Sequence, residues 1–597
     1  MVNKIKISFS MVFWVSVVTA LAQNHLSLEI KSFERHAAIG WNYSGEAATY
    51  FQIFTAEEGE DFKEVFKSTS DSYLHFTDAN TLENYRIYVR ALNGLSQPLA
   101  VSDTVTVVEE KMTDAALVDM VQEAHFRYFW DFAHPSSGMA RERNTSGDVV
   151  TTGGTGFGIM AILVGIENGY ISRSQGLQRL IKLCSFLQFA DKFHGVFPHW
   201  MDGRTGDVFP FSQYDNGGDL VETAFLMEGL LAARSFFDGS DAEEQALRKI
   251  ITKLWEAVEW DFYTKNNSGI LYWHWSPQYQ WQINHAIRGY NEALIVYLLA
   301  ISSPTHSIAP SYWKSGWAGG NYKNGLSYYS LPLPVGPAYG GPLFFAHYSY
   351  LGFDPRGIKD AYCNYFYQNT QHTLINRAYC ISNPLKHKSY SAECWGITAS
   401  DDPGGYLAHE PVNRDNGTIS PTAALSSWPY TPTYSMDALK YFYFKEGEKL
   451  WGQYGFYDAF NPSKNWYASS YLAIDQGPIV VMMQNHKTGL LWNQFMKNDE
   501  IKEGLTKIGF VADVSTIGNE VYELNTATLY PSPSSDGFFI NTSHLPSRIS
   551  VIDNIGKKVE ETTDYRGQMM ATNLCPGLYF VKIYFGTSVV IRPFVKI

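Results

Sequence analysis

The stretch Ala115-Ala-Leu-Val-Asp-Met-Val-Gln-Glu-Ala-His-Phe-Arg-Tyr-Phe-Trp-Asp-Phe132 sets the character of the central region of this 597-residue chain. Within it, Leu117, Val121 and Phe126 recur at the spacing of one face of an α-helix. Similar runs follow at 156–168, 173–192, 220–237, 243–263, 290–300, 435–445 and 471–487. The sequence therefore predicts that residues 111–510 form a mainly α-helical domain.

The length of this region favours one helical architecture. About 400 residues divided among about twelve helices leaves roughly 33 residues for each helix with its loop, a natural length for an (α/α)6 barrel or toroid. Such a barrel would present helix ends and long loops as a cleft, which suits a polymeric substrate.

Residues 25–108 have a different pattern, with short alternating runs such as Tyr50–Phe54 and Tyr85–Arg90 separated by turn residues. Period-2 alternation of this kind predicts a small β-sandwich. The Trp41 position in an early strand and the run Tyr85–Asn93 resemble a fibronectin type III domain. That resemblance implies a spacer or a protein contact and no chemistry of its own.

Residues 524–597 return to a β-strand pattern. Tyr530-Pro-Ser-Pro533, Ile549–Gly556 and Gly577-Leu-Tyr-Phe-Val-Lys582 follow one another there. Their order resembles the C-terminal sorting domain of type IX secretion substrates, although Ser532 replaces the usual Asn. The resemblance implies that the type IX secretion machinery is a partner and that the chain reaches the cell surface or the medium. The alternative is an ordinary small β-sandwich.

The N-terminus has the pattern of a secretory signal peptide over residues 1–22. Lys4 and Lys6 precede the apolar stretch 7–19, and Ala20-Leu-Ala22 supplies a cleavage pattern, so we expect the mature chain to begin at Gln23. An uncleaved membrane anchor is the alternative. No later segment approaches eighteen uninterrupted apolar residues, so we expect no membrane insertion.

The amino-acid composition limits the classes of molecule that the chain is expected to bind. A formal net charge of −13 disfavours nucleic acid, an anionic membrane and a polyanionic substrate. An aromatic content of 15% permits stacking on sugar rings but is equally compatible with a filled core. Five dispersed cysteines do not form a disulfide scaffold, although Cys380 and Cys394 could pair. No zinc-binding pattern is present, so we expect no metal and no cofactor, and a monomer is the default expectation.

Two polar segments precede apolar runs. Gly153–Gly158 is not expected to be a dinucleotide loop, because no strand of a βαβ unit precedes it. In Asp215–Glu222, Asp219 fits a helix N-cap and Glu222 the third helical position, which is a capping-box arrangement. Alternatively, Glu222 points into a barrel mouth, where aromatic surroundings would raise its pKa and keep the proton that a general acid needs.

Several carboxylates remain open as catalytic candidates. Arg288 and Glu292 have the i, i+4 spacing of an ion pair on a helix, and Asp401 and Asp402 precede Pro403 in a predicted turn. Glycoside hydrolysis needs two carboxyl groups on opposite sides of the scissile bond. Sequence spacing does not choose among the candidates, which are Glu142, Asp148, Glu222, Glu292, Asp401, Asp402 and Asp475.

A family resemblance adds to this. The segments Phe129–His134, Gly153–Gly158, Asp215–Glu222, Tyr272–Trp275, Trp395–Asp401 and Ile474–Pro478, taken in order, resemble the bacterial glycoamylase-like family, which includes the endo-β-1,2-glucanases of glycoside hydrolase family 144. The resemblance covers about residues 111–510 and implies an (α/α)6 barrel and an inverting, metal-independent, secreted hydrolase. The substrate that it implies is β-1,2-glucan, or sophorooligosaccharides.

The resemblance also implies residue roles. Glu222 would be the general acid, and Asp401 would activate the water. The residues expected to bind sugar are Arg141, Glu142, Asp148, Trp200, Asp219, Trp273, Trp275, Arg288, Trp395 and Asp475. Three rival functions remain: an α-glucan hydrolase, as the glucoamylase label suggests, a polysaccharide lyase and a non-catalytic surface glycan-binding protein.

Overall fold

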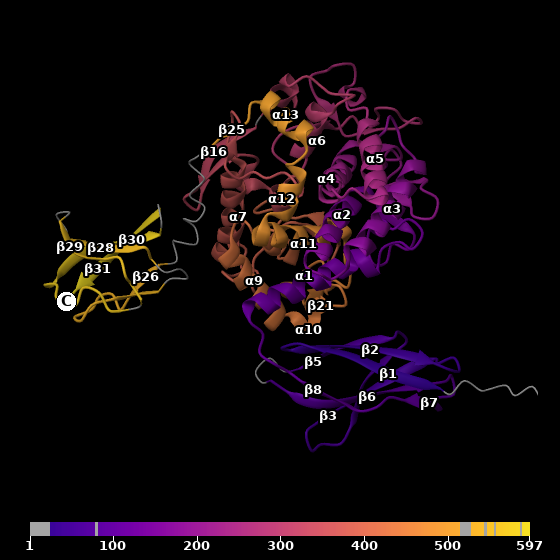
Figure 1. The fold of residues 1–597 in the computed structure, drawn as a ribbon, viewed down its shortest axis with the longest axis horizontal. Helices are drawn as coiled ribbons and strands as arrows, with labels where there is room; N and C mark the ends of the chain where they lie inside the picture. The colour runs from indigo at the N-terminus through magenta and orange to yellow at the C-terminus, as the bar shows by residue number, and fades with distance from the viewer. Residues whose placement is uncertain are drawn as a thin grey trace, which may run out of the picture. The chain divides into compact units, whose positions relative to one another are not determined.

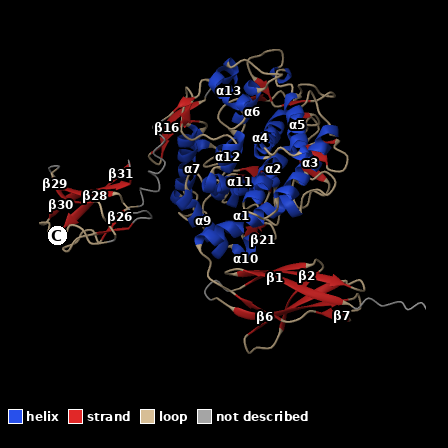
Figure 2. Cartoon of the chain, in the orientation of Figure 1, coloured by secondary structure: helices blue, strands red, loops and turns tan. Residues whose placement is uncertain are grey.

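The computed structural model describes residues 24–77, 82–320, 322–513, 527–541, 546–553, 557–566, 568–585 and 588–597. The expected signal peptide, residues 1–22, lies outside these ranges. The chain divides into two compact units, residues 1–118 and 119–597. Figures 1 and 2 show strands in the first unit, and helices followed by a second set of strands in the other unit.

The N-terminal unit consists of two antiparallel sheets with one core between them. Ile39 and Trp41 from the first sheet pack with Ile53, Ile87 and Val89 from the second, and all five are buried. This two-sheet arrangement is the sandwich expected from the alternating sequence. The first sheet contains β1 (His25–Ser32), β2 (His36–Ser44) and β5 (Ser72–Phe76), and the second contains β3 (Tyr50–Glu57), β4 (Lys63–Ser68), β6 (Asn84–Leu92), β7 (Pro98–Val101) and β8 (Val105–Val108).

The central region is helical, as predicted. Helices α2, α4 and α11 are buried over most of their length, and Figure 1 shows them at the centre of the helical part, with α3, α5 and α9 towards its periphery. The helices are α1 (Asp114–Asp131), α2 (Thr152–Glu167), α3 (Arg173–Phe189), α4 (Leu220–Phe236), α5 (Ala242–Glu256), α6 (Leu294–Ser302), α7 (Tyr365–Ser382), α8 (Pro421–Leu425), α9 (Pro432–Phe444), α10 (Gly447–Leu450), α11 (Ala473–Thr488), α12 (Leu490–Phe495) and α13 (Asp499–Ile508).

The glycine-rich segment 153–158 lies inside α2 and allows close helix packing. A Cβ atom on Gly156 would lie 2.1 Å from the carbonyl oxygen of Phe225 on α4, and one on Gly229 would lie 2.2 Å from the carbonyl oxygen of Gly156. Only glycine lets the two backbones approach this closely. The segment therefore makes a helix–helix contact.

Short antiparallel sheets join the helices at the end where polar residues gather. Two of them contain β9 and β12, which directly precede α2 and α4 and pair with strands from other parts of the chain. The pairs relevant below are β9 (Val149–Thr151) with β10 (Trp200–Asp202) and β11 (Val208–Phe209), β12 (Gly218–Asp219) with β14 (His274–Trp275), β13 (Leu271–Tyr272) with β15 (Ala286–Ile287), and β19 (Ala399–Asp402) with β20 (Gly405–Ala408).

The C-terminal segment is a small β-structure, as expected. Phe538, Ile549, Val551, Val581 and Phe594 form its buried core. Of the motif 549–556, residues 554–556 lie outside the described ranges. The strands are β26 (Thr528–Tyr530) paired with β27 (Phe539–Asn541), and a sheet of β28 (Arg548–Asp553), β29 (Lys558–Thr562), β30 (Gly577–Phe585) and β31 (Ser588–Lys596).

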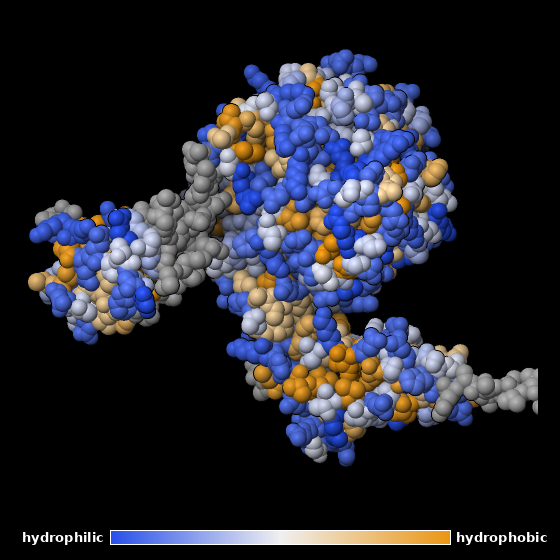
Figure 3. Space-filling view, in the orientation of Figure 1, coloured by the Kyte–Doolittle hydropathy of each residue, from blue (hydrophilic) through white to orange (hydrophobic). Residues whose placement is uncertain are grey.

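Two further expectations concern cysteines and membranes. Cys380 and Cys394 are both buried as free thiols, so the possible disulfide between them is not formed. Among the described residues, no helix is long and apolar enough to cross a membrane. Figure 3 shows a mainly hydrophilic surface on the visible face of the helical part.

Candidate active site

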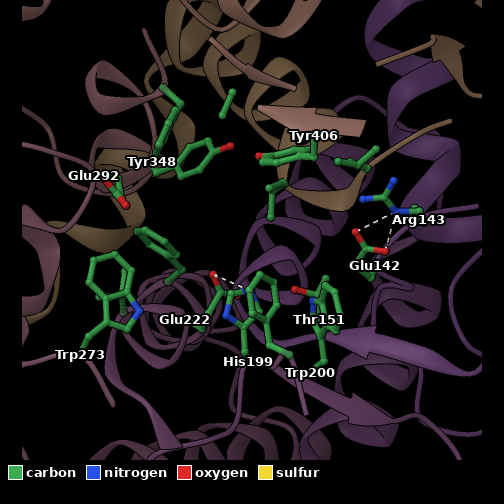
Figure 4. A pocket seen from close by; sticks show the side chains of 17 residues that line it. Glu142, Arg143, Thr151, His199, Trp200, Glu222, Trp273, Glu292, Tyr348 and Tyr406 are labelled. Atoms are coloured by element: carbon green, nitrogen blue, oxygen red, sulfur yellow. Dashed lines mark hydrogen bonds and ion pairs between the residues drawn. The ribbon is translucent and has the colours of Figure 1, made fainter. Parts of the chain in front are cut away.

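A cavity of ≈ 360 Å³ lies at the N-terminal ends of α2, α4 and α11. Thr151 immediately precedes α2, Glu222 lies in the first turn of α4, and Ile474 lies in the first turn of α11. Figure 4 shows polar and aromatic side chains converging on this space. The lining residues are Glu142, Arg143, Thr151, His199, Trp200, Phe211, Val221, Glu222, Phe225, Trp273, Glu292, Phe344, Tyr348, Ala399, Tyr406, Leu472 and Ile474.

Glu222 occupies the wall of this cavity. Asp219 is the N-cap of α4, as predicted, and accepts hydrogen bonds from the backbone nitrogens of Val221 and Glu222. The side chain of Glu222 does not complete a capping box, because its Oε2 accepts from the backbone nitrogen of Gly153 at 2.8 Å. Burial raises the pKa of Glu222 above its ordinary value of 4.5, and the residue remains 8% exposed. Its carboxyl group is therefore both accessible and inclined to keep a proton.

Gly153 is required for this contact. A Cβ atom at that position would lie 2.6 Å from Oε2 of Glu222. The absence of a side chain lets the start of α2 donate its backbone N–H directly to the carboxyl group. The segment of sequence that resembled a phosphate loop thus serves the site through its first glycine.

His199 is a site residue that the sequence analysis missed. Its Nδ1 lies 3.0 Å from Oδ2 of Asp219, and its Nε2 lies 4.0 Å from Oε1 of Glu222. Burial alone would lower the pKa of His199, but the carboxylates of Glu222, Asp219 and Asp215 raise it to about 9. The imidazole therefore carries a positive charge at neutral pH. No motif spacing marked this histidine, since its partners are about twenty residues away in the sequence.

Arg143 joins two of the candidate carboxylates. Its Nε lies 3.0 and 2.8 Å from the two carboxylate oxygens of Glu142, and its Nη1 lies 3.2 Å from each oxygen of Asp401. Glu142 and Arg143 line the cavity, whereas Asp401 contacts Arg143 without being among the lining residues and has a side chain that is 14% exposed. The hydroxyl of Ser470 donates to Oδ2 of Asp401 at 2.6 Å. The orientation of Asp401 is thus fixed by two partners.

Arg143 lines the cavity, whereas the sequence predicted this position for Arg141. The guanidinium of Arg141 donates to the carbonyl oxygens of Gly147 and Phe132, and it lies over the Phe132 ring at 4.6 Å. It does not line the cavity. Both arginines belong to one short run, and only the fold decides which of them turns inward.

Glu292 lies across the cavity from Glu142 and Arg143 in Figure 4. Burial is the main cause that raises its pKa to about 7. The expected helical pair with Arg288 is wrong, because α6 begins only at Leu294, and Arg288 is exposed and away from the cavity. Glu292 was a catalytic candidate in the sequence without being assigned a role, and it belongs to the site.

Two of the four tryptophans expected to stack on sugar line the cavity, Trp200 and Trp273. The indole Nε1 of Trp273 also donates to Oδ2 of Asp219 at 3.0 Å. Trp275 is not among the residues that line this cavity, and it packs edge-on against Phe262 with ring centroids 5.3 Å apart, so its role in sugar binding stays a prediction. The assignment of Trp395 is wrong, because it is fully buried. Tyr348 and Tyr406, which no sequence pattern indicated, line the cavity together with three phenylalanines.

The remaining acidic candidates lie outside the cavity lining. Asp148 contacts His134 at 3.1 Å and Arg204 at 3.2 Å, so its predicted role in sugar binding is not supported. Asp402 accepts from the backbone nitrogen of Gly404, as expected of a turn residue. Asp475 is only 2% exposed and lies in the first turn of α11, so it does not contact sugar directly.

One group of side chains has the composition of a metal site. His199, Asp215 and Asp219 offer ligand atoms that all lie within 4.8 Å of one another. However, Oδ1 of Asp219 already accepts two backbone N–H groups, and Oδ2 accepts the indole N–H and contacts the imidazole. Asp219 therefore accepts from four donors. This arrangement suits a residue that caps α4 and orients His199 better than it suits a metal ligand.

Comparisons with known proteins agree with this geometry. Residues 284–499 match a family model described as "putative glucoamylase", and residues 528–596 match one described as "secretion system C-terminal sorting domain". A curated relative from Parabacteroides distasonis, an exo β-1,2-glucooligosaccharide sophorohydrolase acting at the non-reducing end, is 45% identical over 506 residues, which cover 80% of this chain and 70% of the relative.

Two solved structures are also similar. A β-1,2-glucanase from Parabacteroides distasonis is 43% identical with a TM-score of 0.77, covering 82% of this chain and 74% of that one. An endo-β-1,2-glucanase from Chitinophaga pinensis, in complex with sophorotriose and glucose, is 52% identical with a TM-score of 0.66, covering 67% of this chain and 99% of that one.

Proposed function

Since the chain belongs to the glycoamylase-like family of glycoside hydrolases, we propose that it hydrolyses β-1,2-linked glucan, or its oligosaccharides, by an inverting two-carboxyl mechanism. The observation that carries the proposal is Glu222, an accessible carboxyl group with a raised pKa in the wall of an aromatic-lined cavity. The C-terminal sorting domain makes the chain an exported protein of the cell surface or the medium.

Glu222 acts as the general acid. It holds the proton at the start because burial disfavours its charged form, and it delivers that proton to the leaving oxygen directly or through a sugar hydroxyl. The cation of His199 and the N–H of Gly153 then stabilise the carboxylate that remains. The protonated form of Glu222 is therefore favoured before the proton transfer, and its carboxylate is stabilised after the transfer.

Asp401 acts as the general base that activates water. Arg143 and Ser470 hold its carboxylate in one orientation, and a fraction of its side chain stays open to solvent. Glu142 is the rival for this role, because it lines the cavity directly. Glu142 has both oxygens against a single Arg143 nitrogen, which suits a group that positions arginine and binds sugar hydroxyls. Trp200 and Trp273 supply stacking faces for glucose rings.

The proposal extends to the organisation of the chain. It comprises a signal peptide at 1–22, a fibronectin type III-like domain at 25–108, an (α/α)6 barrel at 111–510 and the sorting domain at 524–597. The central position of α2, α4 and α11, whose first turns meet at the cavity, supports the barrel. Two packed sheets support the N-terminal domain.

Purified protein incubated with β-1,2-glucan, starch and a uronan tests the function. We expect new reducing ends from β-1,2-glucan alone, and the first product seen by proton NMR should have the α-anomeric configuration. Release from starch would favour the α-glucan hydrolase, and an unsaturated product from the uronan would indicate a lyase. Binding of glucan without any product would indicate a non-catalytic glycan-binding protein.

A further inference from the structure

Two buried aspartates lie near Asp401 and have no role in the mechanism described above. Asp458 and Asp475 are each 2% exposed. Among the described residues, no nitrogen or hydroxyl donor reaches Oδ1 of Asp458 or either carboxyl oxygen of Asp475. Buried carboxylate oxygens without donors are rare, because their desolvation is not compensated. These carboxyl oxygens therefore need a partner other than a nitrogen or hydroxyl donor.

That partner is the other carboxyl group. Asp458 and Asp475 lie within hydrogen-bonding distance of each other. Two carboxylates this close in a buried setting cannot both be ionised, and a single shared proton converts their repulsion into a hydrogen bond. Burial raises the pKa of both groups, that of Asp458 to about 7 and that of Asp475 further. The pair titrates as a unit.

The pair is tied to Asp401 by the backbone. Oδ2 of Asp458 accepts a hydrogen bond of 2.7 Å from the backbone nitrogen of Asp401. The backbone nitrogen of Asp458 donates to the carbonyl oxygen of Ser470, whose hydroxyl in turn holds the Asp401 carboxylate. A hydrogen bond from an N–H group to a carboxyl oxygen favours the ionised form of that carboxyl group. Asp458 is therefore the charged member of the pair, and Asp475 carries the proton.

We propose that Asp458 and Asp475 form a one-proton carboxyl pair that positions Asp401 by accepting its backbone N–H, while Arg143 holds its carboxylate. Without that anion, the backbone N–H of Asp401 would lose its charged acceptor, and the Asp401 carboxylate would be held less firmly against Arg143. The charged groups that face Asp458 are Asp401, Asp475 and Arg143, and the hydroxyls of Tyr348 and Tyr406 also face it. The inference rests on the proposed role of Asp401.

Two isosteric variants separate the members of the pair. In Asp475→Asn, the amide N–H₂ replaces the shared proton and still donates to Asp458, so kcat should stay within about threefold of wild type. In Asp458→Asn, the anion that accepts the Asp401 N–H is lost, so kcat should fall about tenfold or more at neutral pH while KM changes little. Asp415→Asn is the matched control, because Asp415 is equally buried but accepts from Tyr379 and Tyr390 away from the cavity.

Equal losses of kcat in both variants, or a loss in Asp458→Asn that appears only in KM, would overturn the proposal. If Asp458→Asn does not fold, infrared difference spectra of wild type against Asp475→Asn at neutral pH decide. A protonated carboxyl band that Asp475→Asn removes supports the pair, and its absence from wild type overturns it. Asp401→Asn separates the two levels of the argument: full activity there would refute the base assignment, whereas the infrared result addresses the pair alone.

Discussion

Oε1 of Glu222 lies 4.0 Å from Nε2 of His199, and both side chains line the same cavity. The contact joins a carboxyl group whose pKa is raised by burial to an imidazole whose pKa is about 9. The cation partly offsets the burial of Glu222, so the acid is strong enough to give up its proton. This balance leads to a specific dependence on pH.

His199→Gln should move the alkaline limb of the kcat/KM profile upward by about one pH unit. Glu222 must be protonated to act, so activity is lost as pH rises through its pKa, and removing the neighbouring cation raises that pKa. The profile measured on sophorooligosaccharides checks this. An unmoved or lowered alkaline limb would show that His199 does not set the protonation of Glu222.

Gly153→Ala should fold but lose activity. The added Cβ would contact Oε2 of Glu222 at 2.6 Å, and that atom is the end of a flexible side chain that can turn away. We expect kcat to fall at least tenfold, with cooperative unfolding retained. Gly156→Ala is the comparison, because its Cβ would meet the backbone oxygen of Phe225 at 2.1 Å. That variant should instead unfold or melt much earlier, and the opposite ranking would contradict the packing described.

Trp200→Leu should raise KM for β-1,2-glucan about five- to tenfold, which corresponds to about 1 kcal/mol of stacking. The ring faces the cavity, so its loss weakens ground-state and transition-state binding together and leaves kcat nearly unchanged. Trp275→Leu is the control, since that ring is not among those that line the cavity. A KM effect of equal size in the control would remove the distinction between the two tryptophans.

Glu228→Gln should stabilise the helical domain at neutral and alkaline pH. Burial raises the pKa of Glu228 from 4.5 to about 8. The folded state therefore binds more protons than the unfolded state between those two pH values, and stability falls as pH rises through that window. Glutamine keeps an acceptor for the backbone nitrogens of Gly352 and Phe353. Thermal melts between pH 5 and 9 should show a flatter decline for the variant, and parallel declines would be inconsistent with a buried, titrating Glu228.

The sequence predicted the helical and β regions because their apolar periodicity is local. It did not predict α7, in which Gln368, Asn369, His372 and Asn376 are buried together with a few apolar residues. Those side chains find partners far away in the sequence, as when Asn376 bonds both backbone groups of Ile397. A hydrophobic pattern carries no signal for a helix that is buried through polar contacts.

The site shows the same limit. Glu222 could be found because an N-cap and a first-turn glutamate have a local pattern. His199, Arg143 and Asp458 could not, since each acquires its role from a partner that only the fold brings near. Trp395 was expected to bind sugar because a family resemblance does not distinguish a ring in the core from a ring in a cavity.

The most direct test compares Glu222→Gln with Glu228→Gln in assays on β-1,2-glucan. Both residues lie on α4, but only Glu222 lines the cavity. Loss of a general acid should lower kcat by about 10²- to 10⁴-fold in Glu222→Gln, while Glu228→Gln keeps its turnover. An aryl sophoroside whose phenol leaves without protonation should restore much of the lost rate. Near-normal turnover of β-1,2-glucan by Glu222→Gln would contradict the account.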